Sequence, residues 1–457
     1  MTLTRTHDQD ARRKRTVVWA VALVTTGMVF DGYDLVAYGA VVPIFLKDPS
    51  QLGEVTPAVA GTLGSYALLG MLFGALLAGA FGDIIGRRRV MLTAYAWFSV
   101  GMAVTAFMSS TTTFGIFRFI TGLGMGALIA TTGALVAEIA PPGKKNLCSA
   151  ISYCGVPLGS LIGSFIAIVL LDSIGWRGLF LIGALPLVTL LPLAIWKLPE
   201  SVSWLVAKGQ LEKARAVSER TGLPMPDSVT QQEAKAEKVG FAGLFSRGFW
   251  FATVVTGLMS ALAQGLNYFL NTWLPVLMEQ AGFNAKGSLA FLLVLSGGAI
   301  VGALAASRFA DRLGPKPVVA ICFLIGGVFI SLMTLELPLP VRLVFVAVVG
   351  LGTTGTSLLI YGLVANQFPT KMRGAAVAWA AGFGRLGGVS GPLLGGFVLA
   401  AGLSVDNIFY ILTGLAVVGV ILTLLVPRAH RENDIHSTPI EPATPVGSGS
   451  PAGSPTT

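Results

Sequence analysis

Two aspartates, Asp31 and Asp34, lie inside an apolar segment that is long enough to form a helix. Their i, i+3 spacing places both carboxyl groups on one helix face, and Tyr38 follows one turn later. Two carboxylates this close in a poorly hydrated site cannot both ionise cheaply, so the pair binds and releases a proton as a unit. The spacing therefore predicts a proton-binding site made by Asp31 and Asp34.

The alternative is a structural role, in which one aspartate pairs with an arginine and holds a helix bundle together. Arg118 and Arg385 are the other two charges inside predicted helices. Histidine, which usually titrates near neutral pH, occurs only as His7, His430 and His436, outside those helices. A proton carrier built from this chain must therefore use a carboxylate.

The composition of the chain requires a lipid environment. Of its 457 residues, 54% are hydrophobic and 12% charged, whereas soluble domains carry about 25% charged residues. The net charge of +9 is expected from basic cytoplasmic loops, so no nucleic-acid partner is predicted. Cys148, Cys154 and Cys322 lie in apolar segments and indicate packing residues. No metal site and no cofactor are expected.

Twelve apolar runs are each about 20 residues long, which is enough to cross a bilayer core of roughly 30 Å. The predicted fold class is an all-α membrane protein with twelve transmembrane helices in two six-helix bundles. The predicted spans cover residues 17–43, 56–82, 90–110, 112–140, 147–172, 176–197, 248–275, 287–310, 317–335, 340–366, 374–401 and 406–427.

The polar segments complete the predicted domain organisation. Residues 1–16 form an N-terminal tail, 17–197 the first bundle, 198–247 a central loop, 248–427 the second bundle and 428–457 a disordered tail rich in Pro, Ser, Thr and Gly. Within the central loop, the charged and Ala-containing stretch from Leu211 to Thr221 predicts a short surface helix.

The distribution of basic residues predicts the orientation. With the N-terminus inside, cytoplasmic segments hold 25 of the 31 Lys and Arg residues and outer loops hold 4, while Arg118 and Arg385 lie within helices. Cytoplasmic loops of membrane proteins collect basic residues. We therefore expect a multi-pass protein of a bacterial-type inner membrane, with the lipid bilayer around it and both termini in the cytoplasm. We expect it to act as a monomer.

The two halves of the chain repeat at an offset of 228 residues. Gly122-Leu123-Gly124 recurs as Gly350-Leu351-Gly352, and Asp83-x-x-Gly86 recurs as Asp311-x-x-Gly314. Two six-helix halves that both start in the cytoplasm are parallel repeats, and such proteins bind substrate between the halves near the middle of the membrane. The repeat therefore favours a carrier over a channel or receptor.

Comparing residues that are 228 positions apart distinguishes structural from functional residues. Structural residues should recur in both halves, and functional residues should not. None of the four embedded charges has a charged counterpart. Asp31 corresponds to Met259, Asp34 to Leu262, Arg118 to Val346 and Arg385 to Pro157. A charge at the centre of a membrane helix costs about 2.5–3.5 kcal/mol on insertion scales, so its retention indicates a function.

These residues resemble the major facilitator superfamily. The resemblance covers roughly residues 17–427 and rests on Gly79-x-x-x-Asp83-x-x-Gly86-Arg87-Arg88-Arg89, on Arg118-x-x-x-Gly122-x-Gly124-x-Gly126, and on Pro199-Glu200-Ser201 with Trp204. Within the superfamily, the chain is similar to the aromatic acid:proton symporter family. That similarity rests on Asp31-Gly32-Tyr33-Asp34 with Tyr38-Gly39 and Pro43, Glu138 before Pro141, Trp273-Leu274-Pro275, and Gly384-Arg385-Leu386-Gly387 leading into Gly391-Pro392.

The resemblance implies proton-driven uptake of an aromatic carboxylate such as benzoate, a hydroxybenzoate or protocatechuate. Transport of another organic anion and proton-antiport export are the alternatives. The exporter signature Gly-Pro-x-x-Gly-Gly is altered in the fifth predicted helix, residues 155–160, which favours uptake. A sugar porter is disfavoured because the second half lacks a Pro-Glu-Thr motif at its end. A membrane enzyme or sensor would need a catalytic cluster or an extra domain, and the sequence contains neither.

Arginine is the expected partner of the substrate carboxylate, because a guanidinium binds it in a bidentate fork. Arg385 lies near the middle of its predicted helix and is preferred for this role. Arg118 lies nearer the outer end of its helix and is expected to pair with the helix 1 aspartates. Helix packing alone is the alternative for Arg118.

Polar side chains inside predicted helices indicate where a cavity lies. Gln264, Asn267, Tyr268 and Asn271 follow i, i+3, i+4, i+7 spacing, and Tyr361 belongs to a similar stripe in the tenth predicted helix. With Tyr38, these residues are predicted to line the substrate site. Trp379 is predicted to stack on the aromatic ring of the substrate.

A second group of charged residues lies at the predicted cytoplasmic ends of helices. Asp83 with Arg87, and Asp311 with Arg312, belong to the repeated motif and are expected to form the conformational gate. Glu138 has the neutral counterpart Asn366. Glu138 is predicted to be a second proton-binding site. The alternatives are that it pairs with Arg87 or Lys144 in the gate, or that it is a surface carboxylate without a special role.

Overall fold

Helices make up the regular secondary structure of the residues that the computed structural model describes, namely 2–141, 143–225, 243–246 and 248–427. The first half holds α1 (Thr2–Lys47), α2 (Pro57–Ile85), α3 (Arg87–Thr105), α4 (Thr111–Ile139), α5 (Lys145–Tyr153), α6 (Gly155–Gly183), η1 (Leu185–Leu187), α7 (Leu190–Lys197), α8 (Val202–Ala207) and α9 (Leu211–Thr221). The second half holds α11 (Trp250–Gln280), α12 (Ala285–Leu313), α13 (Pro315–Leu332), α14 (Leu339–Gly350), η2 (Leu351–Gly355), α15 (Thr356–Gln367), α16 (Thr370–Ala400) and α17 (Val405–Leu425). The predicted all-α class is confirmed, and the predicted disordered tail lies outside the described residues.

The helices account for twelve membrane passes. Eight described segments are long and apolar enough to cross a membrane. One of them, residues 147–197, contains two passes, because the Gly175 backbone leaves the helical conformation with φ 65° and ψ 179°. Three further passes are α3, α11 and the continuous segment α14–η2–α15. Helix α3 begins with three arginines, α11 carries the polar stripe, and the third segment contains a π-helical turn.

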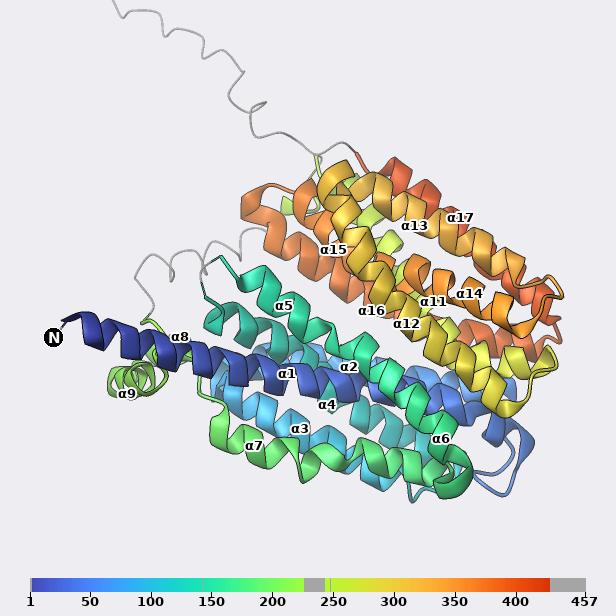
Figure 1. Ribbon diagram of the computed structural model, residues 1–457, viewed down its shortest axis with the longest axis horizontal. Coiled ribbons are helices and arrows are strands. Elements are labelled where there is room, and N and C mark those ends of the chain that lie inside the picture. Colours follow the sequence, from blue (N-terminus) through green and yellow to red (C-terminus); the bar gives the residue numbers. More distant parts are fainter. Residues whose placement is uncertain (1, 142, 226–242, 247, 428–457) are drawn as a thin grey trace, which may run out of the picture.

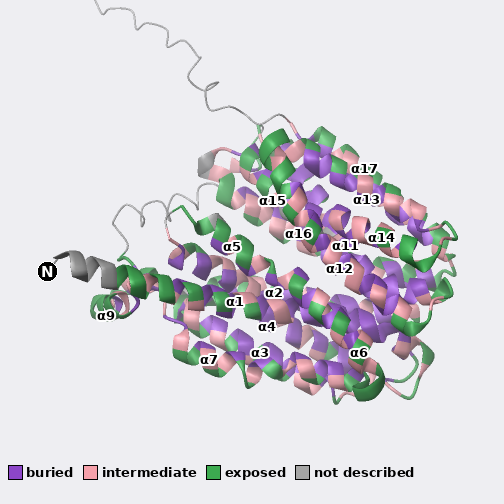
Figure 2. Cartoon of the chain, in the orientation of Figure 1, coloured by how far each residue is buried: buried purple, intermediate pink, exposed green. Residues whose placement is uncertain are grey.

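The passes pack as two bundles, one from α1 to α7 and one from α11 to α17 (Figure 1). Equivalent helices pair in both bundles: α1 contacts α6 as α11 contacts α16, α2 contacts α4 as α12 contacts α14, and α3 contacts α7 as α13 contacts α17. The repeat found in the sequence is therefore expressed as matched packing. Large apolar side chains remain exposed on many of these helices, as expected for a surface that faces lipid (Figure 2).

Helix α1 begins at Thr2 instead of the predicted residue 17 and extends beyond the bundle beside α9 (Figure 1). The Thr16 hydroxyl donates to the Thr221 carbonyl at 3.1 Å, and Arg12 donates to the Glu219 carbonyl at 3.4 Å. The polar residues before the membrane span thus continue the helix because they dock on the central loop. The surface helix predicted from Leu211 to Thr221 is confirmed.

The membrane protein has two faces. The basic face carries α9 and the starts of α1, α3 and α5, and the opposite face carries the far ends of α1 and α11 (Figure 1). Helices α1, α2 and α6 of the first bundle contact α11, α16 and α12 of the second. Figure 1 shows the two bundles diverging toward the basic face.

The contacts between the bundles concentrate toward the opposite face. A Cβ atom on Gly61 would lie 2.6 Å from the Pro392 carbonyl oxygen, and the Ser65 hydroxyl donates to the Val389 carbonyl at 2.7 Å. Two ion pairs also join the bundles there: Lys47 with Glu279, and Lys286 with Asp172 at 3.0 Å. These described contacts therefore hold the two bundles together at the opposite face.

Candidate functional site

Helix α1 brings both aspartates to the boundary between the bundles, and its glycines explain how it fits there. A Cβ atom on Gly32 would collide with the Val156 carbonyl oxygen of α6, and one on Gly39 would collide with the Asn271 carbonyl oxygen of α11. Glycine at these two positions lets α1 lie directly against a helix of each bundle. The aspartates next to Gly32 are buried as a result, with Asp31 5% and Asp34 2% exposed.

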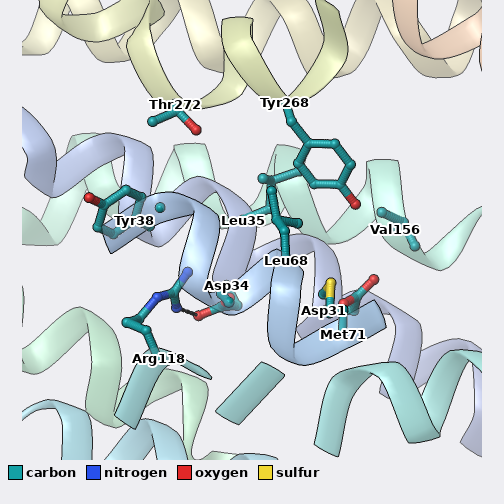
Figure 3. A pocket seen from close by; sticks show the side chains of 12 residues that line it. Asp31, Asp34, Leu35, Tyr38, Leu68, Met71, Arg118, Val156, Tyr268 and Thr272 are labelled. Carbon is teal, nitrogen blue, oxygen red and sulfur yellow. Dashed lines mark hydrogen bonds and ion pairs between the residues drawn. The ribbon is translucent and has the colours of Figure 1, made fainter. Parts of the chain in front are cut away.

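Asp34 forms an ion pair with Arg118 of α4, and each side chain is 3% exposed (Figure 3). The Arg118 guanidinium also lies over the Tyr38 ring, with 5.1 Å from Cζ to the ring centroid, and over the Phe180 ring at 5.8 Å. The expected pairing of Arg118 with a helix 1 aspartate is therefore present. It engages Asp34 and leaves Asp31 outside the pair.

Asp31 is buried, and one of its two carboxyl oxygens has no donor among the described residues. Its Oδ1 atom has no hydrogen-bond partner among the described residues. The charges of Arg385 and Asp34 are the ones that act on it electrostatically. A buried ionised carboxylate without a partner is unfavourable, because the interior does not replace the hydration that it loses. The two aspartates, one turn apart, are thus in different electrostatic environments.

A small cavity of about 20 Å³ lies beside the aspartates, between the two bundles (Figure 3). The side chain of Tyr268 reaches into this region from α11, and Gly388 of α16 lies against its ring. The volume is enough for about one water molecule. The lining residues are Asp31, Asp34, Leu35, Tyr38, Gly64, Ala67, Leu68, Met71, Arg118, Val156, Tyr268 and Thr272.

Arg385 lies on α16 beside Met71, which lines this cavity, but Arg385 itself is not among the lining residues. Its Nη1 atom is 3.8 Å from the Met71 sulfur of α2, so it bridges the two bundles. Its charge also acts on three tyrosines, Tyr153 of α5, Tyr268 of α11 and Tyr361 of α15. Arg385 is half-buried, unlike Arg118. A cation with aromatic and hydroxyl groups around it is suited to an aromatic anion.

The residues of the predicted polar stripe of α11 lie in different surroundings. Gln264 and Ser260 hydrogen-bond with Tyr361 near Arg385. Asn267 and Asn271 instead line a second cavity of about 20 Å³, together with Leu35, Val156, Pro157, Ser160, Leu295, Ser296 and Ala299. Leu35 and Val156 line both cavities, so the two cavities adjoin.

Trp379 is not among the residues that line either cavity, and its stacking on the substrate stays a prediction. Its indole Nε1 donates to the Thr253 carbonyl at 2.8 Å, and its ring packs on Phe245 and Phe383 with centroids 5.1 Å apart in each case. These contacts join α16 to the start of α11. In this structure the indole therefore has a packing role.

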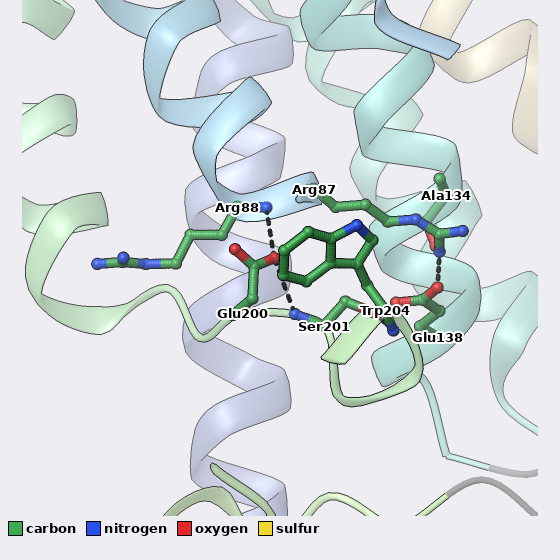
Figure 4. Close-up of polar contacts among 7 residues, drawn as sticks. All are labelled: Arg87, Arg88, Ala134, Glu138, Glu200, Ser201 and Trp204. Atoms are coloured by element: carbon green, nitrogen blue, oxygen red, sulfur yellow. Dashed lines mark hydrogen bonds and ion pairs between the residues drawn. The ribbon is translucent and has the colours of Figure 1, made fainter. Parts of the chain in front are cut away.

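The gate candidates of the first bundle form a network on the basic face (Figure 4). Arg87 pairs with Glu138 of α4. Glu200 accepts the backbone N–H of Arg88 at 3.0 Å and that of Ser201 at 3.1 Å, so it caps the start of α3. This geometry corresponds to the gate-partner alternative for Glu138.

The other gate candidates have no comparable network. Asp311 and Arg312 are exposed at the end of α12, and neither forms an ion pair among the described side chains. The side chain of Asp83 lies outside the described part of the chain. Among the residues that the structure describes, no cluster of His, Cys, Asp and Glu could hold a metal ion.

Three polar residues near the cavities were missed by the sequence analysis: Tyr153, Ser160 and Ser296. The repeat contains the signal that could have found them. At the offset of 228 residues, Tyr153 corresponds to Ala381, Ser160 to Gly388 and Ser296 to Leu68. Like the four embedded charges, these three polar residues have apolar or glycine counterparts in the other half of the chain. That difference between the halves is the signal that marks them.

Comparisons with known proteins agree with this architecture. The model of the sugar (and other) transporter family matches residues 19–429. The benzoate transport protein of Acinetobacter baylyi is 31% identical over 94% of this chain and 92% of that protein. The gentisate transporter of Corynebacterium glutamicum is 33% identical over 84% of this chain and 81% of that protein.

The fold is also similar to that of a solved transporter. The inward open conformation of the xylose transporter from E. coli has a TM-score of 0.72 at 17% identity, covering 91% of this chain and 97% of that one. The resemblance to the major facilitator superfamily is confirmed. The chain is a membrane transporter that belongs to the sugar (and other) transporter family of this superfamily.

Proposed function

We propose that this protein takes up an aromatic carboxylate together with a proton by alternating access. The relatives described above are named for transport of benzoate and gentisate, which are aromatic carboxylates. The observation that carries the proposal is the position of Asp31, which is buried between the bundles, has no hydrogen-bond donor at Oδ1 among the described residues, and lies within electrostatic range of Arg385. This arrangement lets one arginine interact with either a protein carboxylate or a substrate carboxylate.

The proposed orientation places the basic face in the cytoplasm of a bacterial-type inner membrane. Lys and Arg residues concentrate on this face, in agreement with the positive-inside rule. We assign the structure to an inward-open state, because the contacts described above join the bundles toward the opposite face and the helices diverge toward the basic face. We propose that a single chain is the transport unit, since the site lies between the two halves of one chain.

Coupling follows from competition for Arg385. While Asp31 is ionised, its charge attracts the guanidinium and reduces the attraction left for an anion. When Asp31 takes up a proton, that competition ends and Arg385 can bind the substrate carboxylate in a bidentate fork. Binding of the proton and binding of the anion therefore favour each other, as symport requires.

The Arg118–Asp34 pair has a supporting role in this mechanism. Both side chains are buried, and Arg118 is further held over the Tyr38 ring. The pair fixes α1 against α4 and places a constant charge arrangement one turn from Asp31. Asp31 is therefore the proposed proton carrier, and Asp34 is the proposed positioning residue.

The transport cycle then has three steps. Facing outward, Asp31 is protonated and the anion binds Arg385. The bundles rock to the inward-open state, closing the opposite face through Lys47 with Glu279 and Lys286 with Asp172. Asp31 then releases its proton to the cytoplasm, and Arg385 interacts again with the ionised Asp31. The anion leaves past Tyr153 and Tyr361.

Uptake by purified protein in liposomes tests the proposal. Labelled benzoate and 4-hydroxybenzoate are added outside at acidic pH with a neutral lumen, and initial rates are compared with those of protein-free liposomes. This blank is essential because the neutral acids cross lipid by themselves. We expect a saturable, protein-dependent rate that falls when the pH gradient is collapsed. A protein-dependent rate that is insensitive to the gradient would contradict proton coupling, and the absence of such a rate would contradict the substrate class.

A further inference from the structure

The second cavity has the composition of a recognition pocket for a small polar group. Its walls are mostly apolar, and four polar side chains from both bundles face it: Ser160, Asn267, Asn271 and Ser296. Its volume of about 20 Å³ is that of roughly one water molecule or one hydroxyl group. None of the described residues that line it is charged. The pocket is therefore suited to a neutral hydroxyl and unsuited to a carboxylate.

Ser296 differs from its neighbours because its hydroxyl is unsatisfied. The side chain is 4% exposed, and its Oγ has no hydrogen-bond partner among the described residues. By contrast, the Ser160 hydroxyl donates to the Gly32 carbonyl at 3.1 Å, and the Asn271 amide donates to the Asn267 carbonyl at 2.8 Å. A buried hydroxyl without a partner is uncommon, and this one lines a cavity, where a bound molecule can supply the missing partner.

The position of the pocket relative to Asp31 and Arg118 supplies the second part of the inference. Leu35 and Val156 line both cavities, so a flat ring that displaces these side chains could extend from one cavity into the other. The first cavity adjoins Arg385, the proposed partner of the substrate carboxylate, through Met71, and the second cavity is neutral and polar. This polarity matches a molecule with a carboxylate at one end and a hydroxyl group at the other, joined by an apolar ring.

We propose that Ser296 hydrogen-bonds a ring hydroxyl of the substrate and that the pocket around it selects hydroxylated aromatic carboxylates over benzoate. The proposal rests on the proposed function, because it assumes that an aromatic carboxylate occupies the site between the bundles. The serine hydroxyl supplies one donor and two acceptor positions, so it can serve a phenol that donates or accepts. Neither the repeat nor the family motifs assign a role to this residue.

Ser288 provides a matched control on the same helix. It is fully buried in α12, and its Oγ also has no partner among the described residues, but it lines neither cavity. The substitutions Ser296→Ala and Ser288→Ala therefore remove the same unsatisfied group from the same helix. They differ in whether the group faces the proposed pocket.

The experiment measures KM for benzoate, 3-hydroxybenzoate and 4-hydroxybenzoate in liposomes with wild type, Ser296→Ala and Ser288→Ala. Loss of one hydrogen bond predicts that Ser296→Ala raises KM for at least one hydroxybenzoate by about 2- to 10-fold. KM for benzoate should stay within about twofold in both variants, and Ser288→Ala should leave all three values unchanged. Retained benzoate uptake also shows that the variant is folded.

If Ser296→Ala abolishes all uptake, Ser296→Cys replaces it, and a selective rise in KM for a hydroxybenzoate supports the proposal. Equal changes for all three substrates, or no change, would overturn it and indicate that the pocket holds a structural water molecule. Benzoate uptake without hydroxybenzoate uptake by the wild type would also overturn it. A wild type that takes up none of the three acids would instead contradict the proposed function itself.

Discussion

Arg118 forms its buried ion pair with Asp34 and not with Asp31, although the two aspartates lie one turn apart on the same helix. The spacing of the residues could not distinguish these two possibilities. The structure divides them because α4 packs at the level of Asp34, where Tyr38 and Phe180 also hold the guanidinium. Substitution of Asp31 and substitution of Asp34 should therefore have different effects.

Replacing Asp31 with Asn should uncouple transport from protons while preserving substrate exchange. The amide is neutral like the protonated acid, so Arg385 remains available to the anion. We expect counterflow of labelled benzoate between loaded liposomes to continue, and gradient-driven initial rates to fall to the protein-free level. Asp406→Asn, on an exposed residue in the first turn of α17, is the control and should behave as wild type.

Replacing Arg118 or Asp34 alone should destabilise the protein. Each single change leaves one buried charge without its partner, which costs about 3–5 kcal/mol. The double variant Asp34→Asn with Arg118→Gln removes both charges and should unfold at a higher temperature than either single variant. Thermal unfolding in detergent measures this order. Additive losses in the double variant would show that the two side chains do not stabilise each other.

Replacing Arg385 with Ala should weaken substrate binding more than protein stability. A hydrogen-bonded charge contributes about 1.5–3 kcal/mol, so KM should rise roughly 10- to 100-fold. Arg385→Lys keeps the charge but loses the fork, and it should fall between wild type and Arg385→Ala. Arg373→Ala, an exposed arginine on the same helix, is the control. An unchanged KM in Arg385→Ala would assign the substrate carboxylate to another residue.

Neutralising the ion pair between Lys47 and Glu279 should shift the population away from the inward-open state. Lys47 is 68% exposed, and such pairs contribute at most about 1 kcal/mol, so the shift should not exceed about fivefold. Spin labels on Lys144→Cys and Arg373→Cys, in a background without Cys148, Cys154 and Cys322, report the distance across the basic face. Lys47→Ala should increase the fraction of short distances. An unchanged distribution would show that the pair does not stabilise this state.

Glu138→Gln tests whether the carboxylate carries protons or serves the gate. Since Glu138 pairs with Arg87 on the basic face, we expect a lower turnover rate and an unchanged response to the pH gradient. Arg87→Gln should reproduce the lower rate. Loss of the gradient response in Glu138→Gln, with turnover retained, would restore its predicted role as a second proton-binding site.

Much of the fold follows from the sequence because lipid imposes strong rules on it. A membrane span needs about 20 apolar residues, which placed the twelve passes, and the repeat predicted two matching six-helix halves. The start of α1 was missed because its polar residues dock on α9, a contact between distant segments. The break between η1 and α7 was missed because local φ and ψ angles are not visible in hydropathy.

The candidate site was predictable where it depends on charge and less so where it depends on packing. Aspartates and arginines are costly to place in membrane helices. Their presence alone therefore identified Asp31, Asp34, Arg118 and Arg385 as candidate site residues. Serine and tyrosine are cheaper to bury, so Ser296 did not stand out by type. The burial of its unsatisfied hydroxyl is a property of the packed helices.

Proton movement measured directly on addition of substrate is the sharpest test of the coupling between Asp31 and Arg385. Liposomes that contain a pH-sensitive dye start with equal pH on both sides, and benzoate is then added outside. The account predicts rapid acidification of the lumen with wild-type protein, above the protein-free blank, and none above that blank with Asp31→Asn although its labelled-benzoate exchange persists. Protein-dependent benzoate entry by the wild type without acidification above the blank would contradict the account.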